Sequence, residues 1–135
     1  MIKLLRQLRG ILVFSGFSIN TIFWFIPIFL LAIIKLLLPV APLRRAITRV
    51  LMALGENWIT VNSALLLTAG SIDWQARGLE GLRRDGWYLV TVNHQTWVDI
   101  LVMQYVFNRR IPFLKFFIKQ QLIWFPLLGV AWWAM

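Results

Sequence analysis

The feature that most constrains this chain is a run of 24 residues, 11–34, that contains no charged side chain. As an α-helix, the run would be about 36 Å long, and the hydrocarbon core of a bilayer is about 30 Å thick. A cleavable signal peptide has a shorter apolar core of about 7–15 residues and a small-residue cleavage site, and neither is evident. The run therefore predicts an uncleaved membrane anchor. Pro27 is predicted either to kink the helix or to form the turn of a shallow re-entrant segment.

Basic residues lie on both sides of this run. Three precede it and four follow it: Lys3, Arg6 and Arg9, then Lys35, Arg44, Arg45 and Arg49. The positive-inside rule therefore does not decide the orientation of the anchor, because the two counts nearly tie. A helix that lies half embedded in one leaflet would also explain two basic flanks, so spanning and half-embedded topologies both stay open.

Composition supports a membrane location. The chain is 60% hydrophobic with a mean hydropathy of +0.74, whereas soluble domains are about 45–50% apolar. Its net charge of +9 favours an anionic membrane surface over nucleic acid, because the basic residues are scattered and no recognition motif accompanies them. The chain has no Cys and one His, which excludes thiol chemistry and leaves too few ligands for a metal site.

A second helix is predicted over residues 42–70, with Pro42 near its start and Gly70 as its stop. Steps of three or four residues separate most members of its apolar stripe, which is typical of an amphipathic helix. The stripe consists of Ile47, Val50, Leu51, Leu54, Trp58, Val61 and Leu65. Such a helix could pack on the rest of the domain, lie on the membrane surface, or do both.

After Gly70 the pattern changes to that of strands and a helix. Residues 72–76 alternate, residues 87–92 form an apolar run, residues 96–107 suit a helix, and residues 113–118 form another apolar run. This order predicts an α/β unit with parallel strands. The predicted fold class is therefore α/β. A membrane anchor (1–41) and an amphipathic helix (42–70) precede the first part of an incomplete mixed sheet (71–135).

His94 and Asp99 follow the second predicted strand, where ligands gather in open α/β sheets. Five residues along one helix correspond to a rotation of about 140°, so the two side chains would not meet on a single helix. They can meet if His94 precedes the helix and Asp99 lies in its first turn. Thr96 as the N-cap would make Asp99 the third helical residue, which is a capping-box pattern.

This arrangement has a clear chemistry. A carboxylate on one imidazole nitrogen orients the ring, and the other nitrogen can then act as a general base near neutral pH. No elbow motif marks a serine nucleophile, so the direct mechanism is deprotonation of a substrate hydroxyl by the histidine, without a covalent intermediate on the enzyme. The residues alone also allow a structural histidine and an aspartate that only caps a helix.

The segment Asn93-His94-Gln95-Thr96-Trp97-Val98-Asp99 resembles the first motif of the glycerolipid acyltransferase family, which includes the lysophosphatidic acid acyltransferases. That motif is Asn-His-x-Ser-x-x-Asp, and Thr96 here replaces its usual Ser. Residues 78–82 resemble the lead-in to the motif, and residues 119–129 resemble the family's Lys-x-x-Leu-x-x-x-Pro-x-x-Gly segment. Residues 36–40 and 117–122 look closest to a bacterial inner-membrane subgroup of the family.

The resemblance implies transfer of a fatty acyl group from acyl-CoA or acyl carrier protein to the hydroxyl of a lysophospholipid of the lysophosphatidic acid type. It implies His94 as the base, Asp99 as its partner, Asn93 and Thr96 in support, and no cofactor beyond the thioester co-substrate. Lys119 would lie near the substrate channel, where it could attract phosphate, or it could be an ordinary snorkelling lysine. The expected location is the cytoplasmic side of the inner membrane.

The family's later motifs, an Arg-containing segment and a Glu-Gly-Thr-Arg-like segment that hold the acceptor's phosphate, do not occur before Met135. The sequence is therefore expected to be an N-terminal fragment with little or no activity alone. A different class of function also stays open. A small, basic, non-enzymatic membrane protein that binds anionic lipid or a partner would have no need of His94 and Asp99.

Overall fold

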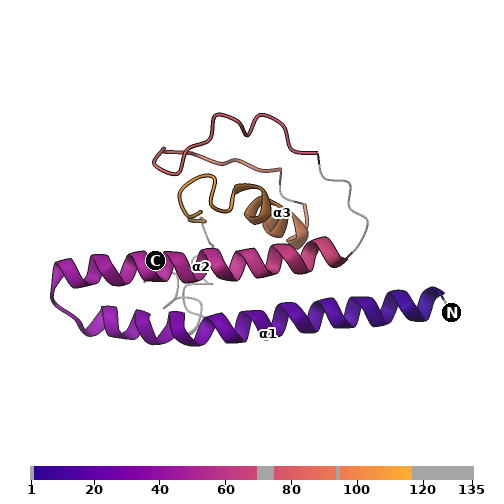
Figure 1. Cartoon of the computed structure of the whole chain (residues 1–135), viewed down its shortest axis with the longest axis horizontal. Helices are drawn as coiled ribbons and strands as arrows, with labels where there is room; N and C mark the ends of the chain where they lie inside the picture. Colours follow the sequence, from indigo (N-terminus) through magenta and orange to yellow (C-terminus); the bar gives the residue numbers. More distant parts are fainter. Residues whose placement is uncertain (1, 70–74, 94, 117–135) are drawn as a thin grey trace. The chain divides into compact units, whose positions relative to one another are not determined.

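The structure is a computed structural model and describes residues 2–69, 75–93 and 95–116. Three helices lie within these ranges: α1 (Ile2–Leu37), α2 (Ala41–Ala69) and α3 (Trp97–Phe107) (Figure 1). Their contacts divide the described residues into two units. The first unit contains residues 2–20 and 59–114, and the second contains residues 21–58 with residues 115 and 116. Of the three boundaries between the units, one falls inside α1, one inside α2 and the third after residue 114.

The predicted helix over the uncharged run is confirmed. α1 is continuous from Ile2 to Leu37, although Pro27 lies inside it. Proline removes one backbone donor, but the surrounding turns keep theirs, so a long apolar helix can accommodate it. The predicted re-entrant turn at Pro27 therefore does not form. The chain leaves the helical path at residues 38–40 and then begins α2, with Pro42 in its first turn.

In the second unit, α1 and α2 pack through a small apolar core. Ile28 and Ala32 of α1 and Ile47 and Leu51 of α2 are buried. Four partly buried apolar side chains pack around them: Trp24, Leu31, Leu38 and Leu54. The indole Nε1 of Trp58 also donates a hydrogen bond to Thr21 Oγ1 over 3.2 Å. These contacts set α1 and α2 antiparallel on either side of the short connection.

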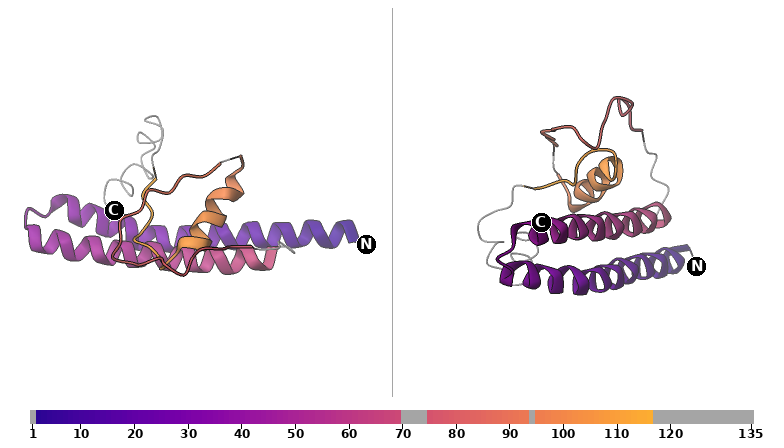
Figure 2. Two further views of the ribbon diagram at one scale, coloured as in Figure 1. Left: turned by 90° about the horizontal axis from the view of Figure 1, so that it is seen from above. Right: turned by 60° about the vertical axis from the view of Figure 1, so that its left-hand side comes forward.

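In the first unit, polar contacts accompany the pairing of the two helices. Asn20 Nδ2 donates to Asn62 Oδ1 over 2.8 Å, and both side chains are buried. The guanidinium of Arg9 donates to the backbone carbonyl of Thr68, in the last turn of α2, with an Nε distance of 2.9 Å. The ends of α1 and α2 that lie in this unit run side by side and antiparallel in both views of Figure 2.

The predicted apolar stripe of α2 is only partly correct. Ile47 and Leu51 are buried as expected, but Val50 and Val61 are 47% and 41% exposed. The residues of α2 that are buried recur at intervals of three or four: Ile47, Leu51, Gly55, Ile59, Asn62 and Leu66. Val50 directly precedes the buried Leu51, and Val61 directly precedes the buried Asn62. Neighbouring residues lie about 100° apart around a helix, so both valines turn away from the contact face.

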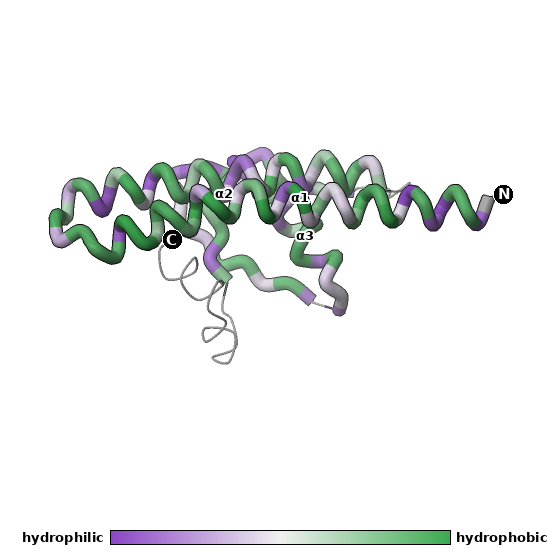
Figure 3. The backbone as a smooth tube through the Cα atoms, turned by 90° about the horizontal axis from the view of Figure 1, so that it is seen from below, coloured by the Kyte–Doolittle hydropathy of each residue, from purple (hydrophilic) through white to green (hydrophobic). Residues whose placement is uncertain are grey.

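Much of the apolar surface of α1 and α2 is exposed. Phe14, Ile19 and Phe23 of α1 are each more than 60% exposed, and Leu43 and Leu67 of α2 are more than 40% exposed. Figure 3 shows hydrophobic residues along most of both helices. Both helices are long and apolar enough to cross a membrane, by length and composition alone. An apolar surface of this extent marks a contact with lipid or protein, which agrees with the predicted membrane association.

The predicted α/β fold class is wrong. Residues 2–69, 75–93 and 95–116 contain three helices and no β-strand. Residues 87–92 were expected to be a strand covered on both faces, yet Trp87 and Leu89 are 100% and 82% exposed. A strand exists only when its N–H and C=O groups pair with a neighbour, and no described residue pairs with this segment. Residues 75 and 76 and 113–116 are likewise not in strands, and the rest of those two predicted strands lies outside the described residues.

Candidate active site

α3 begins at the position and with the local chemistry that its sequence predicts. The expected helix over residues 96–107 is observed as Trp97–Phe107. Thr96 is the N-cap, with φ −140° and ψ 160°, and Asp99 is the third helical residue of a capping box. The backbone N–H of Asp99 points back to Thr96, whose carbonyl oxygen lies 3.1 Å away. The capping prediction for Thr96 and Asp99 is therefore confirmed.

The carboxylate of Asp99 gathers the donors at this helix start. Its Oδ2 accepts hydrogen bonds from the backbone N–H groups of Gln95 (2.7 Å) and Thr96 (2.6 Å). The hydroxyl of Thr96 donates a longer bond of 3.3 Å to Oδ1. A carboxylate has about four acceptor positions, so these three bonds are compatible with a further donor. Two backbone N–H groups and the helix N-terminus both stabilise the ionised form of such a group.

The other predicted site residues are not all visible. His94 and Lys119 lie outside the described residues. Asn93 and Thr96 are exposed, and Asp99 is half-buried. Trp97, in the first turn of α3, is 83% exposed. The structure therefore places Thr96 and Asp99 together at the solvent-accessible start of α3. The part of Asn93 and the pairing of His94 with Asp99 stay predictions.

The opposite end of α3 is held by a residue that the sequence interpretation did not single out. Asn108 is the C-cap, and its backbone N–H donates to the carbonyl of Gln104 over 2.8 Å. Its side-chain Nδ2 donates to Thr60 Oγ1 on α2 over 2.9 Å. Arg109 then adopts a left-handed φ of 60°. Asn directly after an apolar helix is a recognised stop signal, so the C-cap was discoverable, but its contact with α2 was not.

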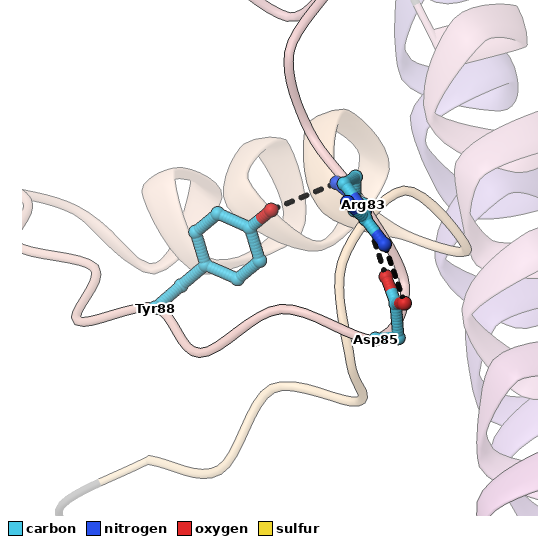
Figure 4. Close-up of polar contacts among 3 residues, drawn as sticks. All are labelled: Arg83, Asp85 and Tyr88. Atoms are coloured by element: carbon cyan, nitrogen blue, oxygen red, sulfur yellow. Dashed lines mark hydrogen bonds and ion pairs between the residues drawn. The ribbon is translucent and has the colours of Figure 1, made fainter.

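A compact turn precedes the motif, and Figure 4 shows its contacts. The Arg83 guanidinium forms two hydrogen bonds with the Asp85 carboxylate, from Nε to Oδ1 (3.0 Å) and from Nη2 to Oδ2 (2.8 Å). The Tyr88 hydroxyl accepts a bond from the Arg83 backbone N–H over 2.8 Å. Hydrogen bonding from Arg83 lowers the pKa of the Asp85 carboxyl and in return raises the pKa of Arg83. Both side chains are more than 70% exposed, so solvent and salt weaken the pair.

Comparison with protein families gives one match. Residues 73–135 match the family model described as Acyltransferase, a range that contains the whole of the predicted motif. No curated protein and no solved structure matched the sequence. The family match supports the acyltransferase family and a transferase role for this part of the chain, and it implies an acyl donor and an acceptor as substrates.

Proposed function

We propose that this protein transfers a fatty acyl group from an acyl thioester, acyl-CoA or acyl carrier protein, to the free hydroxyl of a lysophospholipid. The observation that carries the proposal is the acyltransferase match over residues 73–135, in a chain that also has two helices of membrane-spanning length. An acyltransferase domain attached to a membrane is well suited to an acceptor that is itself a membrane lipid. By its resemblance to the bacterial subgroup, we place it on the cytoplasmic side of the inner membrane, with no cofactor beyond the thioester.

In this proposal His94 is the general base and Asp99 its partner. One ring nitrogen of His94 takes the proton of the acceptor hydroxyl as the oxygen attacks the thioester carbonyl. The tetrahedral intermediate then collapses with cleavage of the C–S bond, and the imidazolium returns the proton to the leaving thiolate. The Asp99 carboxylate stabilises the imidazolium and orients the ring. Its place in the first turn of α3 supports this role, because a histidine before the helix can reach only that turn.

Asn93 and Thr96 would support the dyad, and Lys119 is proposed as a residue that attracts the phosphate of the acceptor. The capping box gives Thr96 a definite part, since its backbone N–H holds Asp99 Oδ2 at 2.6 Å. The Thr96 hydroxyl also lies 3.3 Å from Asp99 Oδ1, and a serine hydroxyl could make the same contact, which explains how Thr96 can replace the Ser of the family motif.

The test is an assay of the protein as produced from its own gene, in membranes, with a radiolabelled acyl thioester and lysophosphatidic acid. The wild type should form phosphatidic acid, and His94→Ala should lower the rate by a factor on the order of 10²–10⁴, the usual contribution of a general base. Membrane association should be unchanged in His94→Ala. If the wild-type protein binds anionic lipid vesicles but transfers no acyl group, the non-enzymatic, lipid-binding alternative is favoured.

A further inference from the structure

A side-chain hydrogen bond with defined geometry links the end of α3 to α2. Asn108 Nδ2 and Thr60 Oγ1 are 2.9 Å apart, although 48 residues separate them in the sequence. Asn108 is also bonded through its own backbone N–H to Gln104 in α3. Asn108 therefore caps the end of α3 and at the same time contacts α2 through its side chain.

Burial at this end of α3 supports a fixed attachment. Gln104, one turn before Asn108, is 7% exposed, and Ile111, three residues after it, is 2% exposed. The backbone N–H groups of Arg110 and Ile111 both return to the carbonyl of Phe107, at 3.0 and 3.4 Å. The chain thus closes tightly after α3, with its apolar residue Ile111 covered, which limits rocking of the helix about the bond between Asn108 and Thr60.

Asp99 lies nine residues before Asn108, and the intervening residues belong to one uninterrupted helix. At 1.5 Å per residue, Asp99 lies about 14 Å along the axis from the attachment. A helix of this length is stiff, so a tilt or shift at Asn108 moves Asp99 with it. Thr60, the other partner, belongs to α2, which is long and apolar enough to cross a membrane.

We propose that Asn108 is a positioning residue, which fixes α3 on α2 and thereby sets the height of Asp99 above the membrane. The proposal rests on the proposed function for its catalytic meaning. An acceptor lipid is held in the bilayer at a fixed depth, so the site has to be presented at that depth. A short-chain acceptor dissolved in water has no fixed depth and can reach a displaced site. Loss of the bond between Asn108 and Thr60 should therefore slow transfer to the bilayer lipid more than transfer to the dissolved acceptor.

Two variants remove the bond from its two sides. Asn108→Leu removes the donor, and Thr60→Val removes the acceptor from an exposed position of α2. If both act through one bond, the double variant should behave like either single variant, whereas independent effects would add. Gln104→Leu is the matched control, because it replaces another buried amide one turn away and leaves the bond between Asn108 and Thr60 intact.

The first readout is the position of α3, independent of activity. The chain has no Cys, so a nitroxide on Trp97→Cys labels the start of α3 alone. We would measure its collisions with oxygen and with a water-soluble nickel complex in vesicles of phosphatidylcholine and phosphatidylglycerol. Asn108→Leu, Thr60→Val and the double variant should shift the ratio of oxygen to nickel collision rates by the same amount. Gln104→Leu should leave this ratio unchanged. An unchanged ratio in the first two variants would overturn the proposal.

The second readout is acyl transfer by the full protein without the label. For long-chain lysophosphatidic acid in vesicles, Asn108→Leu and Thr60→Val should each lower kcat/KM about tenfold, the scale of one lost hydrogen bond. For a monomeric short-chain acceptor, both should stay within about twofold of the wild type. Equal losses with the two acceptors would mean a merely structural role and refute the proposal. A wild type inactive with both would refute the proposed function, while the spin-label result would still decide the positioning.

Discussion

Asn20 of α1 and Asn62 of α2 form a side-chain hydrogen bond of 2.8 Å, with exposures of only 7% and 3%. Each helix here is otherwise mainly apolar, and apolar contacts alone tolerate several rotations and shifts. An amide that lost its partner would face apolar side chains or lipid with its donor and acceptor unsatisfied. The pair therefore favours one rotation and one axial register of α1 against α2 in this unit.

Replacing one member of this pair should cost more than replacing both. Asn20→Leu or Asn62→Leu leaves the opposite amide buried without this partner, and we expect a loss of roughly 0.6–1.7 kcal/mol in free energy of unfolding. The double Leu variant should recover most of it, because an apolar pair of similar size leaves nothing unsatisfied. The free energies of unfolding of the single and double variants can be measured by SDS unfolding in mixed micelles, monitored by circular dichroism. The neighbouring exposed residue gives the control Ile19→Leu, and a double variant with summed losses would contradict the argument.

Close approach of the two helices should also depend on Gly16. A Cβ atom at this position would lie 3.0 Å from Leu65 Cδ2, whereas a Cβ at Gly10 would meet nothing within 4 Å. Leu65 is flexible and can yield to one methyl group, so Gly16→Ala should be tolerated. Gly16→Leu should separate the helices and lower stability by about 1–3 kcal/mol relative to Gly10→Leu. The two Leu variants share the same gain in helix propensity, so their difference in SDS unfolding isolates the contact.

The turn before the motif should depend on Gly86 for a steric reason. A Cβ there would lie 2.7 Å from the Tyr88 ring and its hydroxyl oxygen, far inside contact distance. Gly86→Ala should therefore displace the ring and break the bond between Tyr88 and the Arg83 backbone N–H. Trypsin should then cleave after Arg83 and Arg84 several times faster than in the wild type. Gly81→Ala is the control, since its Cβ meets nothing within 4 Å, and equal cleavage in both variants would count against this explanation.

What the sequence predicted well was local. The capping box of Thr96 and Asp99 involves residues three apart, so spacing and residue type were sufficient to find it. The long helix α1 was likewise evident from the uncharged run. The predicted strand at residues 87–92 depended instead on partners elsewhere in the chain, and an apolar run does not say whether such partners pair with it.

The same distinction explains the errors in α2. The hydrophobic pattern selected Val50 and Val61, which are exposed, and passed over Asn62, which is 3% exposed. Hydrophobicity cannot predict a buried amide, because its burial depends on Asn20, 42 residues away. The role of Asn108 was missed for the same reason, since Thr60 is 48 residues away. At the site, the residue types and spacing of His94 and Asp99 were readable from the sequence, and their pairing stays a prediction because His94 lies outside the described residues.

Asp99 has two proposed functions, and two substitutions should separate them. Asp99→Asn keeps one oxygen that can accept from the backbone N–H groups of Gln95 and Thr96, so α3 should form, but it removes the negative charge that would stabilise an imidazolium. We expect acyl transfer to fall by a factor on the order of 10²–10⁴. Thr96→Val removes the capping hydroxyl, at a cost of about 0.5–2 kcal/mol in stability, and keeps the carboxylate.

Thr96→Val should therefore weaken α3, measured as faster amide hydrogen exchange over residues 97–101, while most of the transfer rate is retained at low temperature. Asp99→Asn should give the opposite result, with slow exchange and a low rate. If Asp99 only capped the helix, both substitutions would act by weakening α3. The acyl-transfer rate would then fall in proportion to the loss of amide-exchange protection in each variant. A rate that collapses while α3 stays protected is the result that only a charge partner for His94 explains.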